Sequence, residues 1–271
     1  MCAETETIMT YISDQAIQWK LIAGALDILI PILVLVVWKV KKKGSILPAL
    51  AGAGIFVVFA MVLEGIPKAI FFGGTTALSR YVWEHPAVYT LIGCLQAGIF
   101  EEVGRFAAFR FLLKKYEKRE DAITYGIGHG GIESILVLGF GAISSVGMAS
   151  MVNSGTLDQV LAGLNEVQAQ SVQMQIATLA GYGAGSMALE VLERIFAMTL
   201  HIALSVVVFR AVKEKKTAYL FAAIALHAVF DVPAALCQCG VLGIAVCELL
   251  LLVMGAACGC FAAKMYAAMK E

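Results

Sequence analysis

Long apolar runs separated by short polar segments follow one another along most of the chain. Residues 46–63 contain no charged side chain, and residues 21–38 contain a single acid, Asp27. A helix needs about 20 apolar residues to cross a bilayer. The pattern predicts seven such helices, over residues 18–38, 46–66, 87–113, 121–148, 177–211, 217–236 and 241–263. Residues 67–86 leave room for a short re-entrant or interfacial helix, which would bring the number of elements to eight.

Composition supports the same fold class. The chain is 60% hydrophobic and only 15% charged, with a mean hydropathy of +0.85, whereas soluble domains carry about 25% charged residues. The net charge is zero, so nothing indicates a nucleic acid partner. We therefore expect an all-α polytopic membrane protein, a single helical domain over residues 1–271, surrounded by the lipid bilayer of a bacterial cytoplasmic membrane.

Basic residues alternate between the two sides of this predicted bundle. Fifteen of the 20 Lys and Arg residues follow the first, third, fifth and seventh spans. The positive-inside rule then places the N-terminus outside and the C-terminus in the cytoplasm. Residues 149–176 become an external loop without Lys or Arg, and its apolar residues at helical spacing predict an amphipathic helix on the outer surface.

Small residues predict where helices approach closely. Gly126 and Gly130 are four residues apart in the fourth span, and Gly181 and Gly185 repeat the spacing in the fifth. Such pairs allow two helix backbones to pack against each other in a membrane.

Ionisable residues inside the predicted spans are the main candidates for chemistry, because burying them in a bilayer is costly. They are Glu101, Glu102 and Arg105 in the third span, His129 and Glu133 in the fourth, Glu193, Arg194 and His201 in the fifth, and His227 and Asp231 in the sixth. At 1.5 Å per residue, the histidines and Glu101 lie roughly 12–20 Å from the basic end of their helices. Four helices therefore carry acids and imidazoles to one level, which we expect to be reached from the cytoplasmic half.

Two kinds of hydrolytic chemistry fit this set. A carboxylate kept ionised beside a cation can act as a general base, and imidazoles at the same depth can stabilise an oxyanion. Alternatively, His129, His201 and His227 would supply the three protein ligands of a catalytic zinc site. Neither an HExxH motif nor a GxSxG motif is present.

The order of these motifs resembles the superfamily of CaaX-processing and bacteriocin-processing intramembrane proteases. The segments "EEVGR", "YGIGHGGIES", "ERIFAMTLH" and "LHAVFD" are most similar to its YhfC branch, and the EExxR spacing is close to that of the PrsW-type proteases. The resemblance covers residues 95–235. It implies that Glu101 or Glu102 activates water, and that His129 and the pair His227 and Asp231 position water and stabilise the oxyanion.

The sequence therefore predicts an intramembrane peptidase of the glutamic type, which cleaves a membrane-associated peptide or protein without a cofactor. Arg105 would keep the glutamates ionised, and Glu133, Glu193, Arg194 and His201 would support the site. Zinc held by the three histidines is the alternative. Two other functions also fit: a proton- or metal-coupled transporter, and a non-catalytic scaffold or immunity protein, because the superfamily includes a non-catalytic subunit of γ-secretase.

Overall fold

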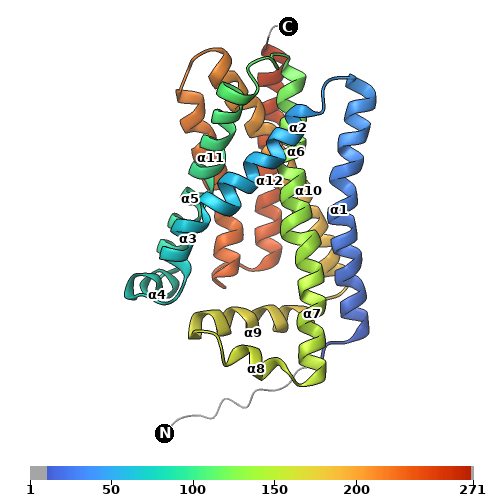
Figure 1. Ribbon diagram of the computed structural model, residues 1–271, viewed down its shortest axis with the longest axis vertical. Coiled ribbons are helices and arrows are strands. Elements are labelled where there is room, and N and C mark those ends of the chain that lie inside the picture. Colours follow the sequence, from blue (N-terminus) through green and yellow to red (C-terminus); the bar gives the residue numbers. More distant parts are fainter. Residues whose placement is uncertain (1–10, 270–271) are drawn as a thin grey trace.

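The computed structural model describes residues 11–269, and within them the chain is helical with no strand (Figure 1). The long helices are α1 (Asp14–Lys42), α5 (Pro86–Ala107), α10 (Ala184–Lys213), α11 (Ala218–Gln238) and α12 (Ile244–Ala268), together with two composite helices. The first composite helix consists of α2 (Leu47–Ile55), η1 (Phe56–Leu63) and α3 (Gly65–Phe72). The second consists of α6 (Arg119–Glu133), η3 (Ser134–Gly139) and α7 (Phe140–Ser154).

Six of these helices are long and apolar enough to cross a membrane. α5 is not among the six, since it carries the Glu–Glu–Arg group in its second half. The chain is thus an integral membrane protein of the predicted all-α class. The count of seven spans, with α5 and its extension η2 (Ala108–Leu112) as the seventh, stays a prediction.

The two ends of the bundle differ in charge and in structure. The segments that follow α1, η2 and α10 carry the basic clusters and lie at one end, close to the C-terminal end of α12 (Figure 1). At the opposite end α8 (Leu157–Leu161) and α9 (Glu166–Ala180) lie crosswise beneath the bundle, and α4 (Ala77–Glu84) lies beside them. Which end faces the cytoplasm stays a prediction from the basic residues.

Several predicted boundaries were wrong by a few residues. α9 runs to Ala180, and α10 begins only at Ala184, so the fifth span does not start at residue 177. Residues 67–86 hold the end of α3 and the whole of α4, which is the short additional helix that the sequence allowed.

Glycines set how closely the helices around α6 pack. A Cβ atom on Gly128 would lie 2.0 Å from the Ala49 carbonyl oxygen in α2, and one on Gly126 would lie 2.6 Å from Ile202 Cα in α10. α6 therefore lies in backbone contact with both neighbours, as the first small-residue pair predicts. The second pair does not pack helices, because a Cβ on Gly185 would meet nothing within 4 Å.

Candidate metal centre

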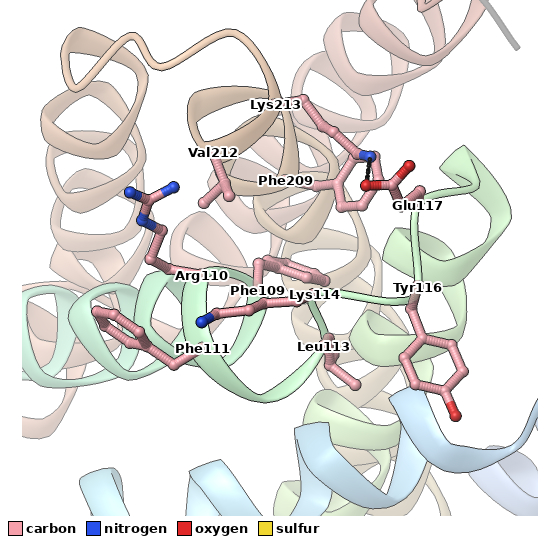
Figure 2. A pocket seen from close by; sticks show the side chains of 10 residues that line it. All are labelled: Phe109, Arg110, Phe111, Leu113, Lys114, Tyr116, Glu117, Phe209, Val212 and Lys213. Atoms are coloured by element: carbon pink, nitrogen blue, oxygen red, sulfur yellow. Dashed lines mark ion pairs between the residues drawn. The ribbon is translucent and has the colours of Figure 1, made fainter.

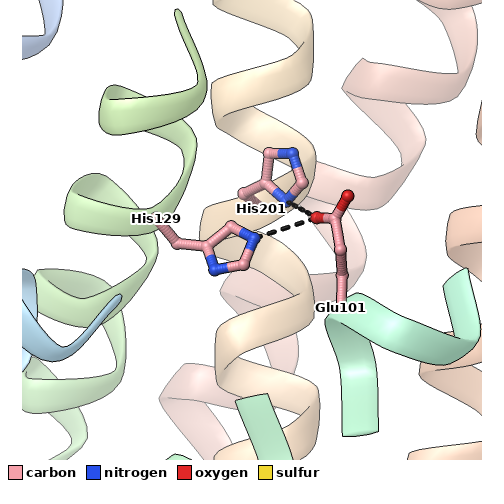
Figure 3. Close-up of side chains that lie close together, drawn as sticks. All are labelled: Glu101, His129 and His201. Atoms are coloured by element: carbon pink, nitrogen blue, oxygen red, sulfur yellow. Dashed lines mark hydrogen bonds and ion pairs between the residues drawn. The ribbon is translucent and has the colours of Figure 1, made fainter. Parts of the chain in front are cut away.

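The centre of the bundle holds three polar side chains from three different helices. Glu101 comes from α5, His129 from α6 and His201 from α10, and each is at most 7% exposed. One potential ligand atom from each lies within 4.8 Å of the others. Both rings turn a nitrogen to the same carboxylate oxygen: Glu101 Oε2 lies 2.9 Å from His129 Nε2 and 3.9 Å from His201 Nδ1 (Figure 3).

The second nitrogen of His201 is held by a carboxylate from a neighbouring helix. His201 Nε2 lies 2.5 Å from Glu133 Oε2. Arg194 Nη1 donates to the other Glu133 oxygen at 3.1 Å, and Arg194 Nη2 donates to Glu193 at 2.6 Å. A histidine ligand of a metal commonly donates its other ring N–H to a carboxylate, which fixes the tautomer and the ring orientation. Glu133 therefore orients His201 so that Nδ1 faces Glu101.

Arg105 also reaches this ring. Its guanidinium is fully buried, and Nη1 donates to the His201 carbonyl oxygen at 3.0 Å while Nη2 lies 3.1 Å from His201 Nδ1. In this arrangement Arg105 occupies the nitrogen that faces Glu101. A cation bound to that nitrogen would have to displace the Nη2 contact, whereas the Nη1 contact with the backbone could stay.

His227 belongs to the same cluster, but both of its nitrogens already face carboxylates. His227 Nδ1 donates to Glu102 Oε1 at 2.8 Å, and Nε2 lies 3.5 Å from Asp231 Oδ2. Arg105 Nη2 lies 3.4 Å from the same Glu102 oxygen, so Glu102 is fixed from two sides and fully buried. Neither nitrogen of His227 is therefore free to act as a further ligand.

These residues fit a zinc ion better than the three-histidine set that the sequence offered. Two imidazoles and one carboxylate are a donor set of catalytic zinc sites, in which a fourth position stays open. Glu101, His129 and His201 provide this set at short mutual distances. His227 does not belong to this set, because its two nitrogens already face Glu102 and Asp231.

A cavity of about 670 Å³ leads away from the cluster. Glu101, His201, His227 and Asp231 lie along its wall, and the wall continues past α3 and the first turns of α5 to the end of α11. Lys68, whose side chain is 53% exposed, lines the mouth. These elements belong to the end of the bundle that lies opposite the basic clusters. The cavity therefore extends away from the basic clusters, whereas the sequence predicts access from the half that carries them.

A second hollow, of about 410 Å³, lies at the basic end and contains none of the predicted catalytic residues. Figure 2 shows its lining, in which the rings of Phe109 and Phe209 lie among the side chains of Arg110, Lys114 and Lys213. Lys213 Nζ forms an ion pair with Glu117 at 3.2 Å.

The sequence found the residues of this centre but paired some of them differently. It placed Glu133 four residues from His129 on one helix, yet Glu133 contacts His201 on α10. It expected Arg105 to serve both glutamates, yet the ion pair of Arg105 is with Glu102.

Three π-helical segments lie beside the centre, and sequence reasoning missed them. η1 begins at Phe56, whose ring packs edge-on against His129. η2 follows α5 directly, and η3 follows Glu133 directly. π-helical turns often occur at functional sites.

Comparison with known proteins gives two matches. Residues 26–251 match the family described as YhfC intramembrane metalloprotease. The chain is also 37% identical over 233 residues to the "uncharacterized membrane protein YhfC" of Bacillus subtilis (strain 168), and the match covers 85% of this chain and 88% of that protein. No solved structure matches the chain.

Proposed function

Because the chain belongs to the YhfC intramembrane metalloprotease family, we propose that it is a metal-dependent peptidase that cleaves a membrane-associated peptide or protein within the bilayer. The observation that carries this proposal is the buried group of Glu101, His129 and His201 at the inner end of a cavity. The metal-free glutamic mechanism that the sequence favoured gains no support from the family's description. The transporter and scaffold alternatives gain none either.

Glu101, His129 and His201 would hold the ion, with Glu133 as the partner of His201. Zinc bound there would polarise the scissile carbonyl and acidify water, so that hydrolysis proceeds near neutral pH. Burial of the three ligands excludes bulk water and strengthens every charge interaction in the site.

His227 is the group best placed to meet the developing negative charge of the substrate carbonyl. It lines the cavity, and the hydrogen bond from Nδ1 to Glu102 orients the ring, so that Nε2, 3.5 Å from Asp231, is the nitrogen that would donate to the substrate. A hydrogen-bond donor that is already oriented stabilises an oxyanion without reorganisation. Glu102 is in turn positioned by Arg105, so these two residues act through His227.

Asp231 is the proposed proton acceptor. Its side chain is 33% exposed, lines the cavity, and has its one ion pair among the described residues with His227, at 3.5 Å. Glu133 is less available, since His201 and Arg194 hold both of its oxygens. A base must lie within hydrogen-bond reach of the water that it deprotonates, and Asp231 is the less constrained carboxylate on the cavity wall.

The proposal is tested with the full chain in liposomes and a pool of apolar peptides of about 20 residues, analysed by mass spectrometry. We expect internal cleavage that stops after dialysis against a chelator and returns when zinc is added. His129→Ala should abolish cleavage, whereas His85→Ala, a matched change at an exposed histidine outside the cavity, should not. Cleavage that survives complete metal removal would instead favour the glutamic mechanism.

A further inference from the structure

A second pair of buried polar side chains lies between the centre and the mouth of the cavity. Glu64 links η1 to α3 and is 1% exposed, and Gln96 on α5 is 7% exposed. Gln96 Nε2 donates to the Glu64 carbonyl oxygen at 3.3 Å and to Glu64 Oε1 at 3.5 Å. The pair therefore fixes the two helices to each other beside the cavity that Glu64 lines.

Each of these side chains keeps one oxygen without a hydrogen-bond partner. Glu64 Oε2 and Gln96 Oε1 are both buried and unpaired, whereas Glu64 Oε1 forms an ion pair with Lys68 Nζ at 3.0 Å. A buried acceptor without a donor is costly, and native proteins rarely keep one without a reason. Lys68 offsets the charge of Glu64 but leaves the second carboxylate oxygen open to another donor.

The pair lies a short distance from the centre. Gln96 precedes Glu101 by five residues on α5, which corresponds to about 7–8 Å along the helix. An extended peptide advances about 3.3–3.6 Å per residue. A substrate strand that passes the centre along the cavity would therefore reach Glu64, which lines the cavity, about two or three residues from the bond that is cut.

The chemistry of the pair fits the backbone of such a strand. A peptide must leave the helical conformation around the scissile bond to be cut, and this frees N–H groups that have no water to bond in the bilayer. Glu64 Oε2 belongs to the residue that lines the cavity and can accept such a hydrogen bond, while Gln96 holds Glu64 in place through its Nε2. A basic substrate side chain fits less well, because Lys68 already lies beside Glu64 and would repel it.

We propose that Glu64, held in place by Gln96, forms a subsite that accepts a backbone N–H group of an unwound substrate segment, two or three residues from the scissile bond. The inference rests on the proposed peptidase function and adds to it the conformation in which the substrate is held. It also explains the use of a carboxylate and an amide at a membrane depth where apolar side chains are the rule.

The test uses a fluorescent apolar peptide of 20 residues with a central Gly-Gly, and a series in which one backbone nitrogen at a time is methylated. Binding is measured by anisotropy to the full chain carrying Glu101→Gln, so that the peptide stays intact. We expect methylation at one or two positions, two or three residues from the cleavage site, to weaken binding about tenfold. Adding Glu64→Gln should weaken binding of the unmethylated peptide by the same factor, and methylation should then have no further effect on binding.

Matched variants separate this result from a loss of folding. Glu248→Gln changes a buried acid on α12 outside the cavity and should leave the methylation pattern intact. Gln96→Leu, which removes the hydrogen bonds that hold Glu64 in place, provides the second variant if Glu64→Gln does not fold. Three results would each overturn the subsite. Methylation could weaken peptide binding equally at every position, methylation could leave binding unchanged at every position, or the chain could bind none of the peptides.

The two proposals fail in different ways. Cleavage by the unmodified chain with an unchanged KM in Glu64→Gln would overturn the subsite and leave the peptidase standing. A methylation-sensitive binding site in a chain that cuts none of the peptides, with or without zinc, would overturn the peptidase and support the subsite as a peptide-binding site.

Discussion

The two hollows of the molecule lie at opposite ends of the bundle and are built from different side chains. The hollow at the basic end is lined by aromatic rings and by cations of the adjoining loop (Figure 2). The other reaches the buried carboxylates and imidazoles of the centre (Figure 3). The basic residues gather at one end of the protein, where they would set its orientation in the membrane, while the cavity that reaches the centre lies towards the other end.

The largest difference is expected when one carboxylate is neutralised in each hollow. Glu101→Gln removes a proposed metal ligand from the buried centre and should lower peptidase activity by at least about 10²-fold, because changes to residues that only support metal ligands already cost about 10–100-fold. Glu117→Gln removes the acid of the basic hollow, which is 70% exposed, and should leave activity unchanged. Cleavage rates of both variants in liposomes measure the contrast, and equal losses would contradict it.

Filling the hollows should give the next largest difference. Ala234→Trp puts a large ring into the cavity that leads to the centre, and blocking substrate there should cost roughly 10²-fold in kcat/KM, since small displacements of a reacting group already cost as much. Val212→Trp fills the basic hollow and should leave kcat/KM close to that of the unmodified chain. If Val212→Trp proved the more damaging change, the substrate route would have to be reassigned to the basic end.

A smaller effect is expected from the packing that holds the centre together. Gly128→Ala would place a methyl group 2.0 Å from the Ala49 carbonyl oxygen, and overpacking of this kind costs about 1–3 kcal/mol. Gly141→Ala adds the same methyl where nothing lies within 4 Å and should not destabilise the protein. Thermal unfolding in detergent compares the two, and equal stability would show that α2 and α6 can separate without loss.

The smallest effect concerns the ion pair at the basic hollow. Lys213→Gln removes the ion pair between Lys213 and Glu117, in which the lysine side chain is 35% exposed and the glutamate side chain 70% exposed. Exposed pairs of this kind contribute at most about 1 kcal/mol, so the unfolding temperature and the cleavage rate should both stay nearly unchanged. A clear loss of activity would give the basic hollow a role that its contacts do not indicate.

Much of this architecture could be predicted from the sequence, because hydropathy and helix length depend on local residue types. The candidate residues could also be named, since an ionisable side chain in an apolar span is costly and therefore conspicuous. His129, His201 and His227 were all found in this way, and the structure brings them together. Their assignment to a peptidase stays a proposal.

The pairing of these residues could not be predicted, because it depends on the rotation of each helix about its axis. Glu133 lies four residues from His129 on the same helix, but the side chain of Glu133 lies against His201 on α10. The π-helical segments η1, η2 and η3 change that rotation and have no signal in the apolar periodicity. The side on which the cavity opens depends on helix packing as well, and the charge pattern does not report it.

The central claim is that Glu101, His129 and His201 hold a metal ion, and metal content measures it most directly. The full chain, purified without chelator and dialysed against a metal-free buffer after zinc loading, is analysed by elemental mass spectrometry. We predict about one zinc per chain, lost in Glu101→Gln, His129→Ala and His201→Ala, and kept in His227→Ala and His85→Ala. Zinc that is absent from the unmodified chain, or that stays bound in all three ligand variants, would contradict the account.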